Sequence, residues 1–108
     1  PWPARLPYFG REHPFRVAVR DYAKANGRAV LILNDRPDKG FAVMPLRELT
    51  GQKRAAVYRW GPDGSEPVGR RDKLSVELDP HHSLLLFVSR DGKPAPDNLN
   101  LGGSFSTE

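Results

Sequence analysis

Apolar residues recur along the chain in short segments that turns separate. Within residues 15–20 the apolar side chains occupy every second position, which predicts a strand with one buried face. Residues 29–33 are apolar without alternation, which predicts a central strand that is covered on both sides. Asn26 and Gly27 separate the two segments, and this dipeptide favours a tight hairpin turn because both residues tolerate positive φ angles.

Further strand signals follow at the short spacing that is typical of an all-β fold. They cover residues 41–44, 55–60, the alternating 73–78 and the apolar 83–89. Residues 66–72 form a weaker segment that contains Pro67, which predicts an edge strand. After Pro45, the segment LRELTG is compatible with a helical turn or a loop. The pattern predicts an antiparallel two-sheet β-sandwich of about seven to eight short strands.

The same pattern predicts the core and the limits of the domain. Five apolar residues of the strongest strands are expected to be buried: Leu31, Leu33, Val76, Leu85 and Phe87. Residues 13–89 should form the sandwich, with an extended lead-in at 1–12 and an extended C-terminal tail at 90–108. The chain begins at Pro1 rather than at methionine, so we expect it to be a piece of a longer polypeptide.

Charge, hydropathy and cysteine content limit the kinds of partner and site that this chain can have. The 108 residues carry a formal net charge of +4, but most basic residues have acidic neighbours in the sequence, and Lys53–Arg54 and Arg70–Arg71 are the only adjacent basic pairs. A groove that follows a nucleic-acid backbone needs a stripe of unpaired cations, so we expect no nucleic-acid partner. No apolar stretch reaches the length of a membrane helix, and we expect no membrane partner. The chain has no cysteine, which excludes disulfides and thiolate metal sites and leaves the cellular compartment undetermined.

The chain shows no catalytic signature and no cofactor motif. Asp72 and Asp79 are the most tempting pair of carboxylates, but they flank a predicted strand and should lie at its opposite ends. Glycosidic bond cleavage with retention needs two carboxyl groups about 5 Å apart. His81 and His82 are adjacent, and adjacent residues of an extended chain point to opposite faces, so we expect no shared metal ion. The chain by itself is therefore not expected to be an enzyme.

Two aromatic residues are the candidate site. Tyr58 and Trp60 have the same parity on one predicted strand, and so they should share a face of the sheet just before a turn. Tyrosine and tryptophan suit a domain interface, where one end of the side chain stays hydrated. Their flat rings also suit stacking on a pyranose. Core or interface is the interpretation that we favour, with a sugar-binding site as the alternative.

The segment VYRWGPDGSEPVGRRDKLSVELDPHHSLLLFVS, residues 57–89, resembles the C-terminal domain of α-galactosidase-type (melibiase-like) glycoside hydrolases. The similarity lies in the spacing from Trp60 to Gly64, the alternating strand 74–78, the corner Pro80-His81-His82-Ser83 and the closing apolar strand. Upstream, GRAVLILNDRPDKGFAVMPLREL is similar to the strand, polar loop and strand that precede this corner in the same family.

The resemblance implies a noncatalytic accessory domain that packs against a catalytic (β/α)₈ barrel, with the paired carboxylates located in that barrel. Two alternatives remain open. A free-standing carbohydrate-binding module would have an exposed aromatic platform and would bind glycans alone. A protein-interaction sandwich would have an apolar patch without affinity for sugars.

Overall fold

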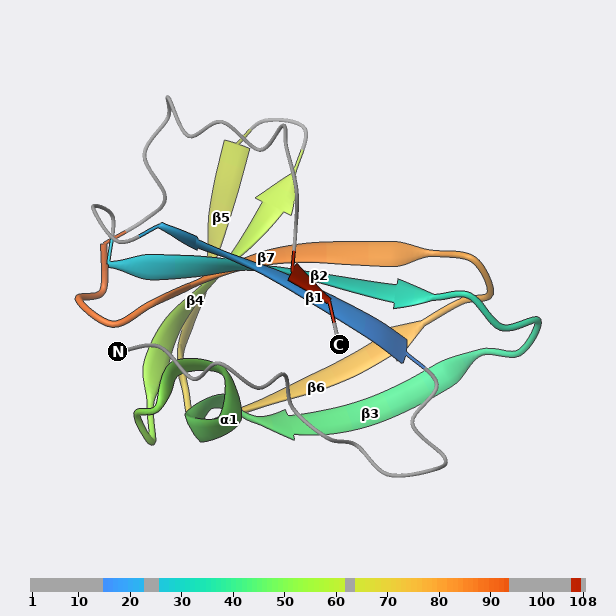
Figure 1. The fold of residues 1–108 in the computed structure, drawn as a ribbon, viewed down its shortest axis with the longest axis horizontal. Coiled ribbons are helices and arrows are strands. Elements are labelled where there is room, and N and C mark those ends of the chain that lie inside the picture. The colour runs from blue at the N-terminus through green and yellow to red at the C-terminus, as the bar shows by residue number, and fades with distance from the viewer. Residues whose placement is uncertain (1–14, 23–25, 62–63, 94–105, 108) are drawn as a thin grey trace.

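The computed structural model describes residues 15–22, 26–61, 64–93 and 106–107 of the chain. This part contains eight strands and one short helix, and it confirms the predicted two-sheet sandwich (Figure 1). The elements are β1 (Phe15–Tyr22), β2 (Gly27–Asn34), β3 (Gly40–Pro45), α1 (Leu46–Thr50), β4 (Ala55–Gly61), β5 (Gly64–Arg71), β6 (Lys73–Leu78), β7 (Ser83–Ser89) and β8 (Ser106–Thr107). The LRELTG segment is thus a helical turn, which ends at Gly51 in the left-handed conformation with a φ of 76°.

The strands form a large and a small antiparallel sheet. The large sheet has six strands in the order β5-β4-β7-β2-β1-β8, and the small sheet pairs β3 with β6. The strands β2 and β7 lie in the middle of the large sheet, and β5 lies at its edge, as predicted. The short β8 brings residues 106–107 of the predicted tail alongside β1. The predicted lead-in at 1–12 lies outside the described residues, and the three-part division of the chain stays a prediction.

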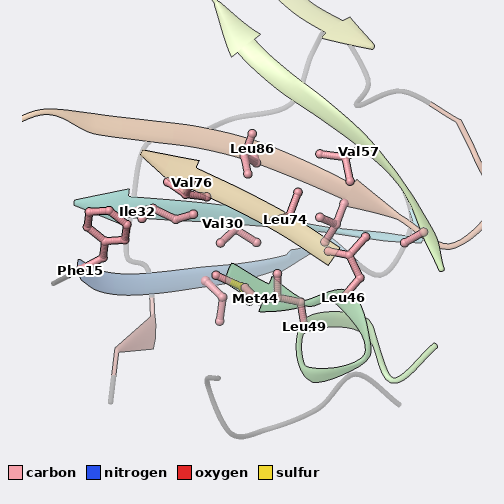
Figure 2. Packing of buried hydrophobic residues seen from close by; sticks show 13 residues of the cluster. Phe15, Val30, Ile32, Met44, Leu46, Leu49, Val57, Leu74, Val76 and Leu86 are labelled. Carbon is pink, nitrogen blue, oxygen red and sulfur yellow. The ribbon is translucent and has the colours of Figure 1, made fainter. Parts of the chain in front are cut away.

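The core lies between the two sheets. Figure 2 shows Val30 and Ile32 of β2 on the same side of the large sheet as Leu86, together with Leu74 and Val76 of β6. The helix α1 adds Leu46 and Leu49, both 0% exposed, to one end of this cluster. Burial of each such side chain favours folding by about 1.5–3 kcal/mol.

The predicted core was wrong at three of its five positions. Val76 and Phe87 are buried, whereas Leu31, Leu33 and Leu85 are half-buried. Successive residues of a strand point to opposite faces, and these three leucines occupy the outer face of the large sheet. A strand that is apolar on both faces gives no sign of which face points inward, and the sequence therefore identified the strand but not its orientation.

The β1–β2 hairpin is confirmed, but its turn is displaced from the predicted one. Tyr22 pairs with Gly27, so Gly27 already belongs to β2 and Asn26 precedes it, while residues 23–25 lie outside the described part. Asn26 has the expected positive φ, 47°. Gly27 is needed for a different reason, because an added Cβ would lie 2.1 Å from the ring of the buried Phe87. The ring occupies the space that any larger residue would fill.

A buried arginine fastens β2 to the rest of the fold at one end. Arg28 is 2% exposed, and its guanidinium donates to both carboxylate oxygens of Asp21, at 2.5 and 3.3 Å. The same group donates to the Leu49 carbonyl at 3.0 Å, while Arg90 Nε donates to the Thr50 carbonyl at 2.9 Å. Two arginines therefore satisfy the last carbonyls of α1, which have no partner within the helix.

A buried asparagine fastens β2 at the other end. The Asn34 amide nitrogen donates to the carbonyls of Asp38, Leu78 and Asp79 at 2.9, 3.0 and 3.2 Å. Its amide oxygen accepts from the Arg36 N–H at 3.1 Å. These carbonyls belong to the loop before β3 and to the end of β6. One side chain thereby joins the large sheet to the end of β6 and to the loop that leads into β3.

This arrangement predicts that Asn34→Asp will strongly destabilise the protein. A carboxylate cannot donate, and it would place negative charge against three carbonyl oxygens in a buried position. We expect a loss of about 3 kcal/mol or more in the free energy of unfolding, measured by urea denaturation, since buried unpaired charge costs several kcal/mol. The exposed Gln52→Glu makes the same chemical change and should cost less than about 0.5 kcal/mol. Equal effects of the two substitutions would contradict the assigned role of Asn34.

Candidate functional site

The outer face of the large sheet is apolar where the two central strands meet. Leu31 pairs with Leu85 across β2 and β7, and Leu33 lies next to them on β2. All three are half-buried. The outer face of β6 differs, because it carries the exposed Lys73, Ser75 and Glu77. We call the three leucines the leucine face.

Tyr58 lies on the same outer face as Leu85, next to the buried Phe87, with which it is in register on β7. The ring is half-buried, and the hydroxyl donates a 2.5 Å hydrogen bond to the Gly92 carbonyl. Tyr58 thus holds the turn that follows β7, a contact of high sequence separation that no local pattern reveals. Trp60 continues β4 and its backbone pairs with Ser65, but its side chain lies outside the described part, so the shared face of the two rings stays a prediction.

An aspartate stabilises the same turn from within. One oxygen of Asp91 accepts from the Ser89 hydroxyl at 2.7 Å and from the Lys93 N–H at 2.9 Å. The backbone hydrogen bond from Lys93, followed by that from Ser89, holds the pKa of the Asp91 carboxyl below its ordinary value of 3.8. The turn is therefore ordered both by Tyr58 and by an ionised carboxylate.

A second surface is a polar groove between the small sheet and the large one. It has a volume of about 390 Å³ and is lined by β6, by the turn between β6 and β7, by Lys39 and by Arg59 of β4. We call it the β6 groove. Its charged wall is built around Lys39, whose Nζ lies 2.7 Å from Glu77 and 3.9 Å from Asp79, and His82 Nδ1 lies 4.0 Å from Asp79.

The charges of this wall are coupled. The hydrogen bond and the negative charge of Glu77 raise the pKa of the Lys39 ammonium, and Asp79 adds to the effect. All of these side chains are more than half exposed, so water screens their attraction and the wall contributes little to stability. It presents hydrogen-bond donors and acceptors side by side.

The other sequence candidates are not brought together. Asp72 and Asp79 lie at opposite ends of β6, as predicted. His81 has a positive φ of 62° and His82 accepts a backbone hydrogen bond from Asn34, so both serve the corner between β6 and β7. Within the described residues no three His, Cys, Asp or Glu side chains are grouped to hold a metal ion. No helix of that part is long and apolar enough to cross a membrane.

The fold recurs in solved structures of glycosidases. A β-L-arabinopyranosidase of glycoside hydrolase family 27 from Geobacillus stearothermophilus matches 79% of this chain with a TM-score of 0.62 and 22% sequence identity. A variant of that enzyme in complex with arabinose matches 73%, with a TM-score of 0.61 and 21% identity. A proposed α-N-acetylgalactosaminidase from Bacillus halodurans C-125 matches 75%, with a TM-score of 0.58 and 17% identity.

The matches cover only part of those enzymes. This chain spans 18–19% of their length, so it has the fold of one region of the enzyme and not of the whole. No protein-family model and no curated protein matches the sequence. These structural matches confirm the predicted resemblance of this chain to a β-sandwich region of such glycosidases.

The geometry of the turn after β7 predicts a pH dependence that Asp91→Asn should reduce. Because the folded pKa of Asp91 is lowered, the ionised carboxylate stabilises the fold above the ordinary pKa of 3.8. That contribution is lost as the pH falls through the lowered, folded-state pKa. The variant should therefore be less stable than the natural chain at pH 7 and closer to it at pH 2, as measured by urea unfolding.

Asp38→Asn is the control, because it also removes one negative charge but lies in the exposed loop before β3. It shows how far the loss of any single surface carboxylate changes the pH dependence of stability. If Asp91→Asn and Asp38→Asn changed the pH dependence equally, the turn would not be the source.

Proposed function

We propose that this chain is a noncatalytic accessory domain of a glycoside hydrolase, which packs against the catalytic barrel and stabilises it. The observation that carries the proposal is the match of about three quarters of the chain to about a fifth of each glycosidase. The sequence similarity of residues 57–89 to the C-terminal domain of α-galactosidase-type enzymes points in the same direction. In such an enzyme the paired carboxylates belong to the barrel.

The leucine face supports a docking role. A sandwich that faces water on its outer side gains nothing from Leu31, Leu33 and Leu85 there, since polar residues would serve equally well. An apolar patch on a sheet face is typical of a protein interface. The barrel of the same polypeptide is the partner that the fold comparison suggests.

Tyr58 favours docking over sugar stacking. A stacking platform needs an open ring face, whereas Tyr58 is half-buried and its hydroxyl is already bonded to the Gly92 carbonyl. At an interface the same hydrogen bond fixes the ring while its apolar side meets the partner. Trp60 belongs to this proposal as the second aromatic of the docking surface.

The chain alone should not hydrolyse glycosides. We expect no turnover above the buffer blank with aryl α-galactosides or aryl β-L-arabinopyranosides, because Asp72 and Asp79 lie at opposite ends of β6. Release of the aryl group, followed spectrophotometrically, is the measurement. Turnover that disappears in Asp72→Asn or Asp79→Asn would overturn the noncatalytic assignment.

Docking is tested by comparing the chain alone with the longer polypeptide in which it is joined to its barrel. Leu85→Ser should lower the melting temperature of the longer polypeptide by several degrees more than that of the chain alone, because only the former loses an interface contact. Val43→Ser is the control, since Val43 is an exposed apolar residue of the small sheet, 45% exposed.

Equal losses for Leu85→Ser in both contexts would mean that the leucine face does not dock. A coding sequence that joins this chain to something other than a barrel of alternating strands and helices would reject the accessory role itself.

A further inference from the structure

The β6 groove has the dimensions and the chemistry of a binding site. Its volume of about 390 Å³ lies at the lower end of the range of about 300–1,000 Å³ that is typical of small-molecule sites. It lies between the sheets, whereas the leucine face is the outer side of the large sheet, so docking on that face leaves the groove a separate surface. The groove is open to water.

The groove offers apolar contact surface as well as polar groups. Val76, Leu78 and Leu84 line it, and the last two are only half-buried. Aliphatic side chains of this kind can contact the C–H face of a ring, while polar groups around them fix its orientation. A ligand with both an apolar face and many hydroxyl groups fits this combination.

One wall is suited to hydroxyl groups. The carboxylates of Glu77 and Asp79 accept hydrogen bonds, and Lys39 between them donates. Vicinal hydroxyl groups are donors and acceptors at once, so a pyranose can bond to a carboxylate and an ammonium group side by side.

The groove is lined by two cations, Lys39 and Arg59, and two carboxylates, Glu77 and Asp79, and Arg59 is the cation that has no ion pair among the described residues. Arg59 is exposed on β4, in register with the inward-facing Leu86, and contributes to the lining. No hydrogen bond or ion pair links its side chain to any other residue that the structure describes. The carboxylates of Glu77 and Asp79, in contrast, are both close to Lys39. A guanidinium with a free fork of donors is suited to bidentate contact with a carboxylate.

We propose that the β6 groove binds an acidic sugar unit of an oligosaccharide, with the sugar carboxylate on Arg59 and its hydroxyl groups on Glu77, Asp79 and Lys39. The choice of a sugar rests on the proposed function, and the choice of an acidic one rests on the unpaired arginine. The site is noncatalytic and would hold a uronate-containing chain close to the enzyme.

Isothermal titration of the 108-residue chain with trigalacturonic acid tests this proposal. We expect binding that weakens at least tenfold in Arg59→Ala and weakens with added salt, because a charged contact is lost or screened. Arg70→Ala removes an exposed arginine of the edge strand β5 and should leave the affinity unchanged. Melting curves of both variants verify folding, and Arg59→Gln is the second variant if Arg59→Ala is unstable.

Three results would overturn the site. They are equal affinity for neutral galactotriose, equal affinity for a short peptide that ends in aspartate, and trigalacturonate binding that Arg59→Ala leaves unchanged. The titration needs no barrel, so its failure is distinct from failure of the docking experiment, which compares melting temperatures of two polypeptides.

Discussion

The architecture depends on two buried polar side chains at the ends of the inner face of β2. Arg28 links β1, β2 and the end of α1, and Asn34 links β2 to the end of β6 and to the loop before β3. Val30 and Ile32 between them pack in the core, but apolar contacts alone tolerate sliding and rotation of one sheet over the other. The directional bonds of Arg28 and Asn34 fix that relative position. Everything that the two sheets form together, the β6 groove included, depends on them.

The sequence predicted the strands well, because their residues alternate or cluster between turns. The bounds of β6 and β7 were predicted correctly, and so was the edge position of β5. Which residues of the central strands point into the core could not be predicted, because neighbours such as Leu31 and Ile32 are equally apolar. Arg28 and Asn34 look like ordinary polar residues in the sequence, since their partners lie in segments that only the folded chain brings near.

The candidate surfaces show the same limit. Tyr58 was identified from its residue type and parity, but its hydrogen bond to Gly92 joins residues that are 34 positions apart. The β6 groove is lined by Lys39, Arg59 and Asp79, which come from three parts of the chain, so no local sequence motif could predict this grouping. The aromatic candidate, Tyr58, could be identified from its residue type, whereas the charged β6 groove could be identified only from the tertiary fold. Both surfaces are compatible with one domain, because they belong to different sides of the large sheet.

The edges of the large sheet limit how this chain can associate with others. One side ends at the two-residue β8, which occupies part of the outer edge of β1. The other side ends at β5, where Pro67 lacks an N–H, a register shift opposite Val57 and Tyr58 breaks the ladder, and Gly69 adopts a φ of 115°. Neither edge offers a long, regular row of backbone donors and acceptors on which a second copy could extend the sheet. The large sheet is thereby protected from strand-by-strand extension, and a partner of this sheet has to approach it through a face.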